Sequence, residues 1–106
     1  MPIRAFRMSL NPGQAEEYRQ RHEQIWPELV DALRSAGVSD YRIFLDPQSF
    51  ALFAVMTHDD AHQLDQLHTL EVMQRWWQYM QPIMHSHPDA SPVTVDLQPV
   101  FSLARD

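Results

Sequence analysis

Histidine is the residue type in this chain that is best suited to transfer protons near neutral pH, and the chain has six of them. His22 stands out because Tyr18 precedes it and Trp26 follows it at a spacing of one helical turn. A residue on such an aromatic stripe faces the interior of a protein. His22 is therefore either a general acid–base group in a buried site or a core histidine hydrogen-bonded to its surroundings, and its spacing alone leaves both interpretations open.

Two further pairs of histidines have spacings that occur in metal sites. His58 and His62 are four residues apart, and His85 and His87 flank a serine. Neither pair is accompanied by a third and a fourth ligand at short range. We therefore expect these four side chains to be solvated polar residues, and we expect neither a metal ion nor a cofactor.

Two adjacent tryptophans form the second chemical feature. Successive helical residues point about 100° apart, so Trp76 and Trp77 can form adjoining walls of one cavity, and flat apolar rings suit the C–H face of a sugar. Packing in the core with Met73 and Met80 is the alternative interpretation. A site with these indoles would gain hydroxyl donors and an imidazole from Tyr18, Tyr41 and His22. That mixture is expected for a small polyhydroxy ligand.

Composition excludes several other kinds of chemistry. The chain has no cysteine and no lysine, which excludes thiol nucleophiles, disulfides and Schiff-base catalysis on lysine. Its two glycines cannot form a phosphate-binding loop. The net charge is -6 and the arginines are scattered along the chain, so nucleic acid is not an expected partner.

Length and hydropathy favour one globular domain. A chain of 106 residues suffices for one hydrophobic core, so we expect a single domain over residues 1–106. The longest apolar stretch, residues 50–56, is too short to cross a bilayer, and the N-terminal residues lack the apolar block of a secretory signal. We therefore expect no membrane partner and a cytoplasmic location, which the absence of cysteine fits.

The N-terminal part is expected to form a strand followed by a broken helix. Residues 3–10 alternate polar and apolar side chains, the period of a half-buried strand. Asn11 is expected to cap the following helix. Pro27 cannot continue that helix, so we predict a break at Trp26 and a second helical piece that Gly37 ends.

A hairpin and two helices are expected next. Residues 41–45 and residues 50–56 are typical of strands joined by a turn. Asp59 is expected to cap a short helix, and Thr69 a longer helix with a wide apolar arc. Residues 93–103 are expected to form the last strand.

These elements predict an α+β fold. Their order, βαββαβ, is that of the ferredoxin-like arrangement, in which the helices cover one face of the sheet. Residues 50–56 are apolar on both faces of their strand. Because the helices cover only one face, we expect a second copy of the same sheet to cover the other, which predicts a homodimer.

Several segments together resemble the L-rhamnose mutarotase family. They are residues 17–22 (EYRQRH), 25–29 (IWPEL), 74–80 (QRWWQYM) and 91–93 (SPV), and the similarity continues over essentially the whole chain. The resemblance implies a dimeric α+β barrel without a cofactor. It also implies that His22 is the proton donor and that the sugar-binding residues are Tyr18, Tyr41, Trp76 and Trp77.

The function implied by this resemblance is the interconversion of the α and β anomers of L-rhamnose. The pyranose ring opens when the ring oxygen gains a proton and the anomeric hydroxyl loses one, so a general acid and a general base are needed. His22 is expected to be the acid, and a tyrosine, a carboxylate or a water could be the base. Two alternatives stay open at this point: a non-catalytic dimeric barrel that binds a small ligand, and a haem-handling enzyme on the same barrel.

Overall fold

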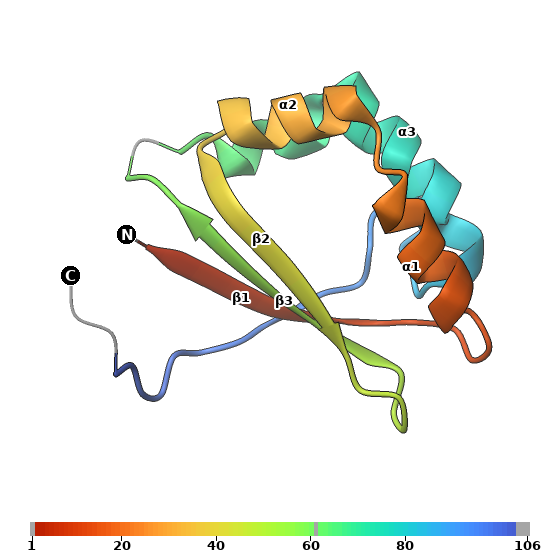
Figure 1. The fold of residues 1–106 in the computed structure, drawn as a ribbon. Coiled ribbons are helices and arrows are strands. Elements are labelled where there is room, and N and C mark those ends of the chain that lie inside the picture. The colour runs from red at the N-terminus through yellow and green to blue at the C-terminus, as the bar shows by residue number, and fades with distance from the viewer. Residues whose placement is uncertain (1, 61, 104–106) are drawn as a thin grey trace.

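The chain forms an α+β structure around one four-stranded antiparallel sheet, in a computed structural model that describes residues 2–60 and 62–103. The strands lie in the order β2-β3-β1-β4, and their bounds are Ile3–Ser9 (β1), Val38–Leu45 (β2), Ala51–His58 (β3) and Val95–Asp96 (β4). Three α-helices cover one face of this sheet (Figure 1). They are α1 (Ala15–Glu23), α2 (Pro27–Ser35) and α3 (Glu71–Met80), with short 3-10 helices η1 (Leu64–Thr69) and η2 (Gln81–Ile83) beside α3.

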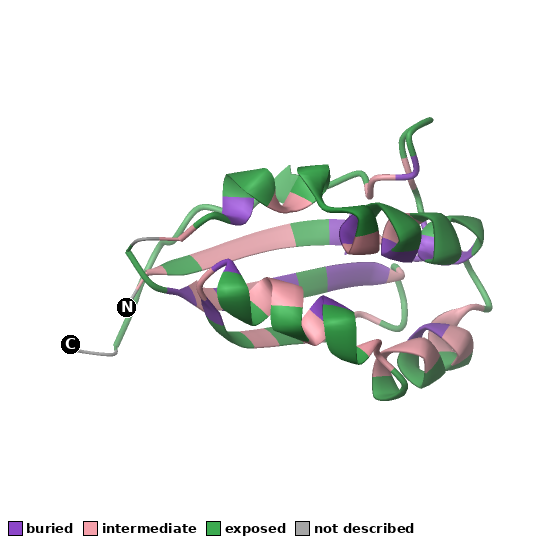
Figure 2. Cartoon of the chain, turned by 90° about the horizontal axis from the view of Figure 1, so that it is seen from above, coloured by how far each residue is buried: buried purple, intermediate pink, exposed green. Residues whose placement is uncertain are grey.

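The predicted first strand and hairpin are confirmed. β1 pairs with β3 over its whole length, and β3 pairs with β2, so β3 and β1 are the central strands. Alternate side chains such as Met8, Leu52 and Ala54 are buried, which is the period-two pattern of a strand with one face on the core. Seen from above in Figure 2, buried positions lie along these strands and on the helices that cross them.

The predicted helix break is also confirmed. α1 ends at Glu23, and Trp26 has extended backbone angles (φ -66°, ψ 131°) immediately before Pro27, the first residue of α2. Pro27 fits this position because the first helical N–H needs no intrahelical partner. Gly37, with φ 108°, follows the end of α2 as expected. The break turns α1 away from α2 and allows both helices to cover the sheet (Figure 1).

The three predicted helix caps are wrong. The Asn11 side chain instead donates a hydrogen bond to the carbonyl oxygen of Pro82, at 3.2 Å. Asp59 is not a cap because the next helical element, η1, begins at Leu64. Thr69 donates its hydroxyl hydrogen back to the carbonyl of Gln66, at 2.7 Å, and α3 begins after Leu70 without a side-chain cap. Asn11 and Thr69 therefore bond to main-chain carbonyl groups instead of capping a helix, and after Asp59 the helical element begins later than predicted.

The predicted last strand is too long. Only Val95 and Asp96 form β4, and the Leu97 N–H donates one further bond to Ala5 at 2.9 Å. The segment that follows has no strand pairing among the described residues, and its apolar side chains, including Phe101, are exposed. Pro99 has no N–H with which to extend the ladder. No helix among the described residues is long and apolar enough to span a membrane.

Candidate functional site

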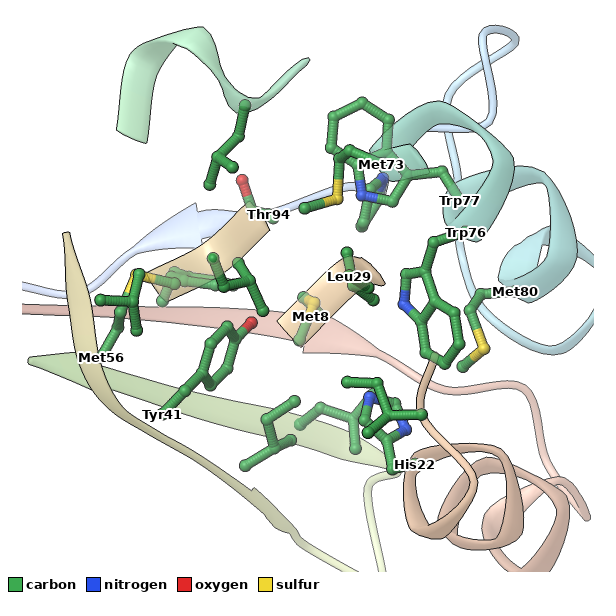
Figure 3. Close-up of a pocket in the computed structure, with 18 of the residues that line it drawn as sticks. Met8, His22, Leu29, Tyr41, Met56, Met73, Trp76, Trp77, Met80 and Thr94 are labelled. Carbon is green, nitrogen blue, oxygen red and sulfur yellow. The ribbon is translucent and has the colours of Figure 1, made fainter. Parts of the chain in front are cut away.

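A cavity of about 1240 Å³ lies between the sheet and the helices. Its floor is formed by side chains of β1, β2 and β3, and its roof by side chains of α1, α2 and α3 (Figure 3). All five residues predicted from the sequence line this one cavity: Tyr18, His22, Tyr41, Trp76 and Trp77. The cavity is larger than the roughly 300–1,000 Å³ that is usual for small-molecule sites, so a monosaccharide and water fit together.

α1 orients the imidazole of His22. His22 lies one turn after Tyr18, and its Nδ1 is 3.0 Å from the Tyr18 main-chain carbonyl oxygen. A carbonyl oxygen only accepts hydrogen bonds, so Nδ1 must carry the hydrogen. In the neutral ring the Nε2 atom is then an unprotonated acceptor, which makes Nε2 the atom of His22 that is available for proton transfer.

Burial also affects the proton affinity of His22. Removal from water lowers the pKa of His22, while the hydrogen bond to the Tyr18 carbonyl acts in the opposite direction and raises it. The net pKa is below the ordinary value of about 6.5. The neutral imidazole therefore predominates at neutral pH, with its lone pair on Nε2.

α3 supplies the aromatic wall beside His22. The centres of the His22 and Trp76 rings are 5.5 Å apart and their planes meet at 88°. Trp76 is also in edge contact with Trp26, at 5.1 Å between ring centres, and only 7% of it is exposed. Trp76 is thus both a core residue and a wall of the cavity, so the two interpretations from the sequence, core packing and cavity wall, are compatible. Trp77 is half-buried and forms the adjoining wall.

The two tyrosines contribute hydroxyl groups. Tyr41, on β2, packs edge-on against Phe6, and its hydroxyl points into the cavity (Figure 3). Burial raises the pKa of Tyr41 to about 12. Burial likewise raises the pKa of Tyr18, and the neighbouring Tyr41 raises it further. Both phenols therefore remain protonated at neutral pH, and each can donate and accept a hydrogen bond.

The C-terminal segment brings two polar residues to the cavity that were not singled out from the sequence. Thr94 and Asp96 line it, and Asp96 lies opposite the cavity-facing Phe6 in the register of β4 and β1. The other cavity-lining carboxylates are paired with arginines: Glu16 with Arg19 at 2.9 Å, Asp40 with Arg42 at 3.1 Å and Asp65 with Arg4 at 3.8 Å. Asp96 has no ion pair with an arginine or histidine of residues 2–60 and 62–103. Thr94 and Asp96 are two residues apart, the spacing of side chains on one face of an extended chain, and this spacing was the available clue in the sequence.

Of the remaining histidines, His68 also lines the cavity, whereas the two predicted pairs, His58 with His62 and His85 with His87, do not. His85 and His87 are exposed, as predicted. The prediction of a solvated side chain is wrong for His58, which is 7% exposed and donates from Nδ1 to the carbonyl of Asp59 at 2.8 Å. Its ring packs against His62 with 4.5 Å between centres. In the part of the chain that the structure describes, no three His, Cys, Asp or Glu side chains gather as a metal site would require.

Known proteins resemble this chain over nearly its whole length. The L-rhamnose mutarotase of Paraburkholderia phytofirmans is 61% identical over 99 residues, which cover 93% of this chain and 92% of that protein. The L-rhamnose mutarotase of Brucella anthropi is 52% identical, with 93% of each chain covered.

Solved structures show the same likeness. The crystal structure of an L-rhamnose mutarotase from Formosa agariphila matches with a TM-score of 0.92 and 39% identity, over 98% of this chain and 100% of that one. A Pseudomonas aeruginosa protein at 16% identity, with a TM-score of 0.57, shares the fold alone. The family model described as rhaM, L-rhamnose mutarotase, matches residues 4–103. By this match and by these identities, the chain belongs to the L-rhamnose mutarotase family.

Proposed function

We propose that this chain interconverts the α and β anomers of L-rhamnose, with His22 as the proton-transferring residue. The observation that carries the proposal is the joint lining of one cavity by an imidazole, two protonated phenols and two indoles. The imidazole can transfer protons, the phenols can hold sugar hydroxyls, and the indoles can pack against the apolar face of a deoxy sugar. The same five residues are those that the family resemblance implied from the sequence.

In the proposed reaction, one imidazole serves as base and then as acid. Neutral His22 accepts the proton of the anomeric hydroxyl on Nε2, and the resulting imidazolium donates it to the ring oxygen as the bond between that oxygen and the anomeric carbon breaks. The anomeric and ring oxygens are bonded to the same carbon, so one nitrogen can reach both. The product is the open aldehyde, and His22 is neutral again. After rotation about the bond to the aldehyde carbon, the reverse steps close the ring on its other face.

The phenols act in this scheme as hydrogen-bonding groups rather than as the partner base. The pKa of Tyr41 is raised to about 12, so formation of tyrosinate at neutral pH is unfavourable. Tyr41 and Tyr18 instead orient sugar hydroxyls in the cavity. Asp96 can accept further hydrogen bonds from the sugar, because no described basic side chain pairs with it.

The homodimer is part of the same proposal. Side chains of the sheet face opposite the cavity include Phe44 and Phe53, which are directly opposite each other in the β2–β3 register and are 56% and 36% exposed. Val95 on β4 is also exposed on this face. Neighbouring exposed apolar side chains such as Phe44 and Phe53 are typical of an interface, and Arg7 of β1 stands between Phe53 and Val95 in the strand register. The strand order β2-β3-β1-β4, with the helices on one face, supports the ferredoxin-like arrangement and a second copy packed sheet against sheet. We extend the proposal to a cytoplasmic location, which the cysteine-free sequence fits.

Proton NMR tests the activity directly, because the anomeric protons of the α and β forms of L-rhamnose give separate signals. Magnetisation exchange between the two signals is expected to speed up in proportion to the concentration of added protein. The spontaneous rate in the same buffer is the control. Binding of L-rhamnose without any acceleration of exchange would support the ligand-binding alternative and overturn the proposed activity.

A further inference from the structure

We propose that Arg21 is a positioning residue, which holds His22 against Trp76 by fastening the last turn of α1 to the C-terminal end of α3. This inference rests on the proposed function of His22. It concerns a side chain that does not line the cavity and that was not singled out from the sequence.

Arg21 makes three contacts, two of which join α1 to α3. Its Nη1 donates a hydrogen bond to the main-chain carbonyl oxygen of Tyr79, and its guanidinium carbon lies 4.1 Å from the centre of the Tyr79 ring. Its Nε donates to Glu17, one turn earlier on α1, at 2.7 Å. The Arg21 side chain is 17% exposed, against 40% to 70% for the other arginines that form ion pairs among the described residues. Arg21 is therefore held at the helix contact, not extended into solvent.

The acceptor, the Tyr79 carbonyl oxygen, lies at the C-terminal end of α3, where a positive charge is favourable. The last four carbonyl groups of a helix have no intrahelical partner, and the C-terminal end of a helix favours positive charge. α3 ends at Met80 and has no basic residue in its own last turn. Arg21 supplies that charge from another helix and satisfies the Tyr79 carbonyl. The contact stabilises the end of α3 and fixes the position of α1 at once.

His22 and Trp76 lie directly beside this contact. His22 follows Arg21 in the sequence, and Trp76 is three residues before Tyr79 on α3. α1 has only nine residues, no side-chain hydrogen bond at its N-cap and one buried residue, Tyr18. So short a helix has little stability of its own and depends on its tertiary contacts. Loss of the Arg21 contact is therefore expected to let His22 move relative to Trp76 and to the sugar.

Arginine is required because all three contacts are made by its planar guanidinium group. The guanidinium donates in two directions while its face covers the Tyr79 ring. A lysine ammonium keeps the charge but cannot make these contacts at the same time. The variants Arg21→Met and Arg21→Lys therefore separate a requirement for this geometry from a requirement for charge.

The test measures kcat and KM by anomer exchange, together with the ring-proton NMR signals of His22, which the spectrum of a His22→Ala variant assigns. Displacement by about 1 Å can cost on the order of a hundredfold in rate, so we expect kcat to fall about tenfold to a hundredfold in both variants, with a smaller change in KM. The His22 signals are expected to shift, because the ring current of Trp76 acts on them only at close range. The matched control is Arg75→Met: Arg75 also joins two helices, through Glu28 at 3.3 Å, but it contacts neither Tyr79 nor α1. It is expected to retain both the wild-type kcat and the His22 signals.

Three outcomes would overturn the inference. They are an unchanged kcat in folded Arg21 variants, unchanged His22 signals, and a lower melting temperature with normal kcat in the folded molecules. If Arg21→Met does not fold, Arg21→Lys decides, because it retains the charge at the end of α3. If the wild-type protein itself fails to accelerate exchange, the proposed function fails, whereas the His22 signals still report whether Arg21 positions the ring.

Discussion

His22 donates a hydrogen bond from Nδ1 to the main-chain carbonyl of Tyr18, at a distance of 3.0 Å. This single contact fixes which ring nitrogen is free and therefore where a proton can be exchanged. Burial at the same place lowers the pKa of His22. Together the two effects present a neutral imidazole with an open Nε2 to the cavity at neutral pH.

The rate of anomer exchange is expected to depend on the protonation of His22. Because the neutral ring starts the proposed reaction, the rate should be constant near neutral pH and fall as the pH decreases through the His22 pKa, which lies below about 6.5. NMR exchange rates, corrected for the spontaneous reaction at each pH, check this prediction. A rate that rises as the pH falls would show that imidazolium starts the reaction.

The same pKa change affects stability and supplies a control. The folded pKa of His22 is lower than the unfolded one, so the unfolded state binds more protons between the two values, and the free energy of unfolding decreases as the pH falls through that range. The melting temperature must therefore be measured at each pH. A loss of rate can be assigned to protonation of His22 only when the protein remains folded at that pH.

Tyr41→Phe is expected to weaken sugar binding while retaining the fold. The variant keeps the ring that packs against Phe6 and removes the hydroxyl that points into the cavity. A lost hydrogen bond of about 1 kcal/mol corresponds to roughly a fivefold change in affinity, so KM should rise by about that factor or more. Tyr79→Phe is the matched control, because Tyr79 does not line the cavity. Equal kinetics for the two variants would exclude Tyr41 from the sugar site.

Trp77→Phe is expected to raise KM and to reduce the response of tryptophan fluorescence to L-rhamnose. Trp77 is half-buried on the cavity wall, so a bound sugar changes the surroundings of its indole. Emission spectra recorded during a sugar titration check this. Trp26→Phe, measured in parallel, gives the contribution of a tryptophan that does not line the cavity. Normal binding and turnover in Trp77→Phe would count against Trp77 as a cavity wall.

The protein is expected to be a dimer with twice the mass of the 12.5 kDa chain. Phe53→Asp should shift the equilibrium toward the monomer, because it replaces a large apolar side chain of this sheet face with a charged one. Light scattering at micromolar concentration measures both proteins. A wild-type species of 12.5 kDa alone would contradict the sheet-against-sheet interface.

Periodic elements could be predicted from the sequence because local patterns determine them. The alternation in β1, the break at Pro27 and the hairpin of β2 and β3 are confirmed. The grouping of the five site residues came from the family resemblance and from helical spacing, and all five line one cavity. Their roles in catalysis and binding remain predictions.

Features that depend on distant partners could not be predicted. The Asn11 side chain bonds to Pro82, and Arg21 bonds to a carbonyl 58 residues later, so no local pattern marks either contact. The length of β4 depends on its pairing with β1, a strand that is distant in the sequence, and this pairing covers only two residues of β4. His58 is buried because its ring contacts Asp59 and His62 and its backbone N–H bonds to Pro2. The sequence shows only a polar residue at the end of a strand, so these partners could not be predicted.

The most direct test of the account is the rate of anomer exchange of L-rhamnose in a His22→Ala variant, with the melting temperature measured on the same sample. We predict that the rate falls about a hundredfold to ten-thousandfold, because a general acid–base group is lost. The melting temperature should change little, because buried Tyr18 and Leu29 and the contact between Trp26 and Trp76 remain. Exchange at the wild-type rate in a well-folded variant would contradict the assignment of His22.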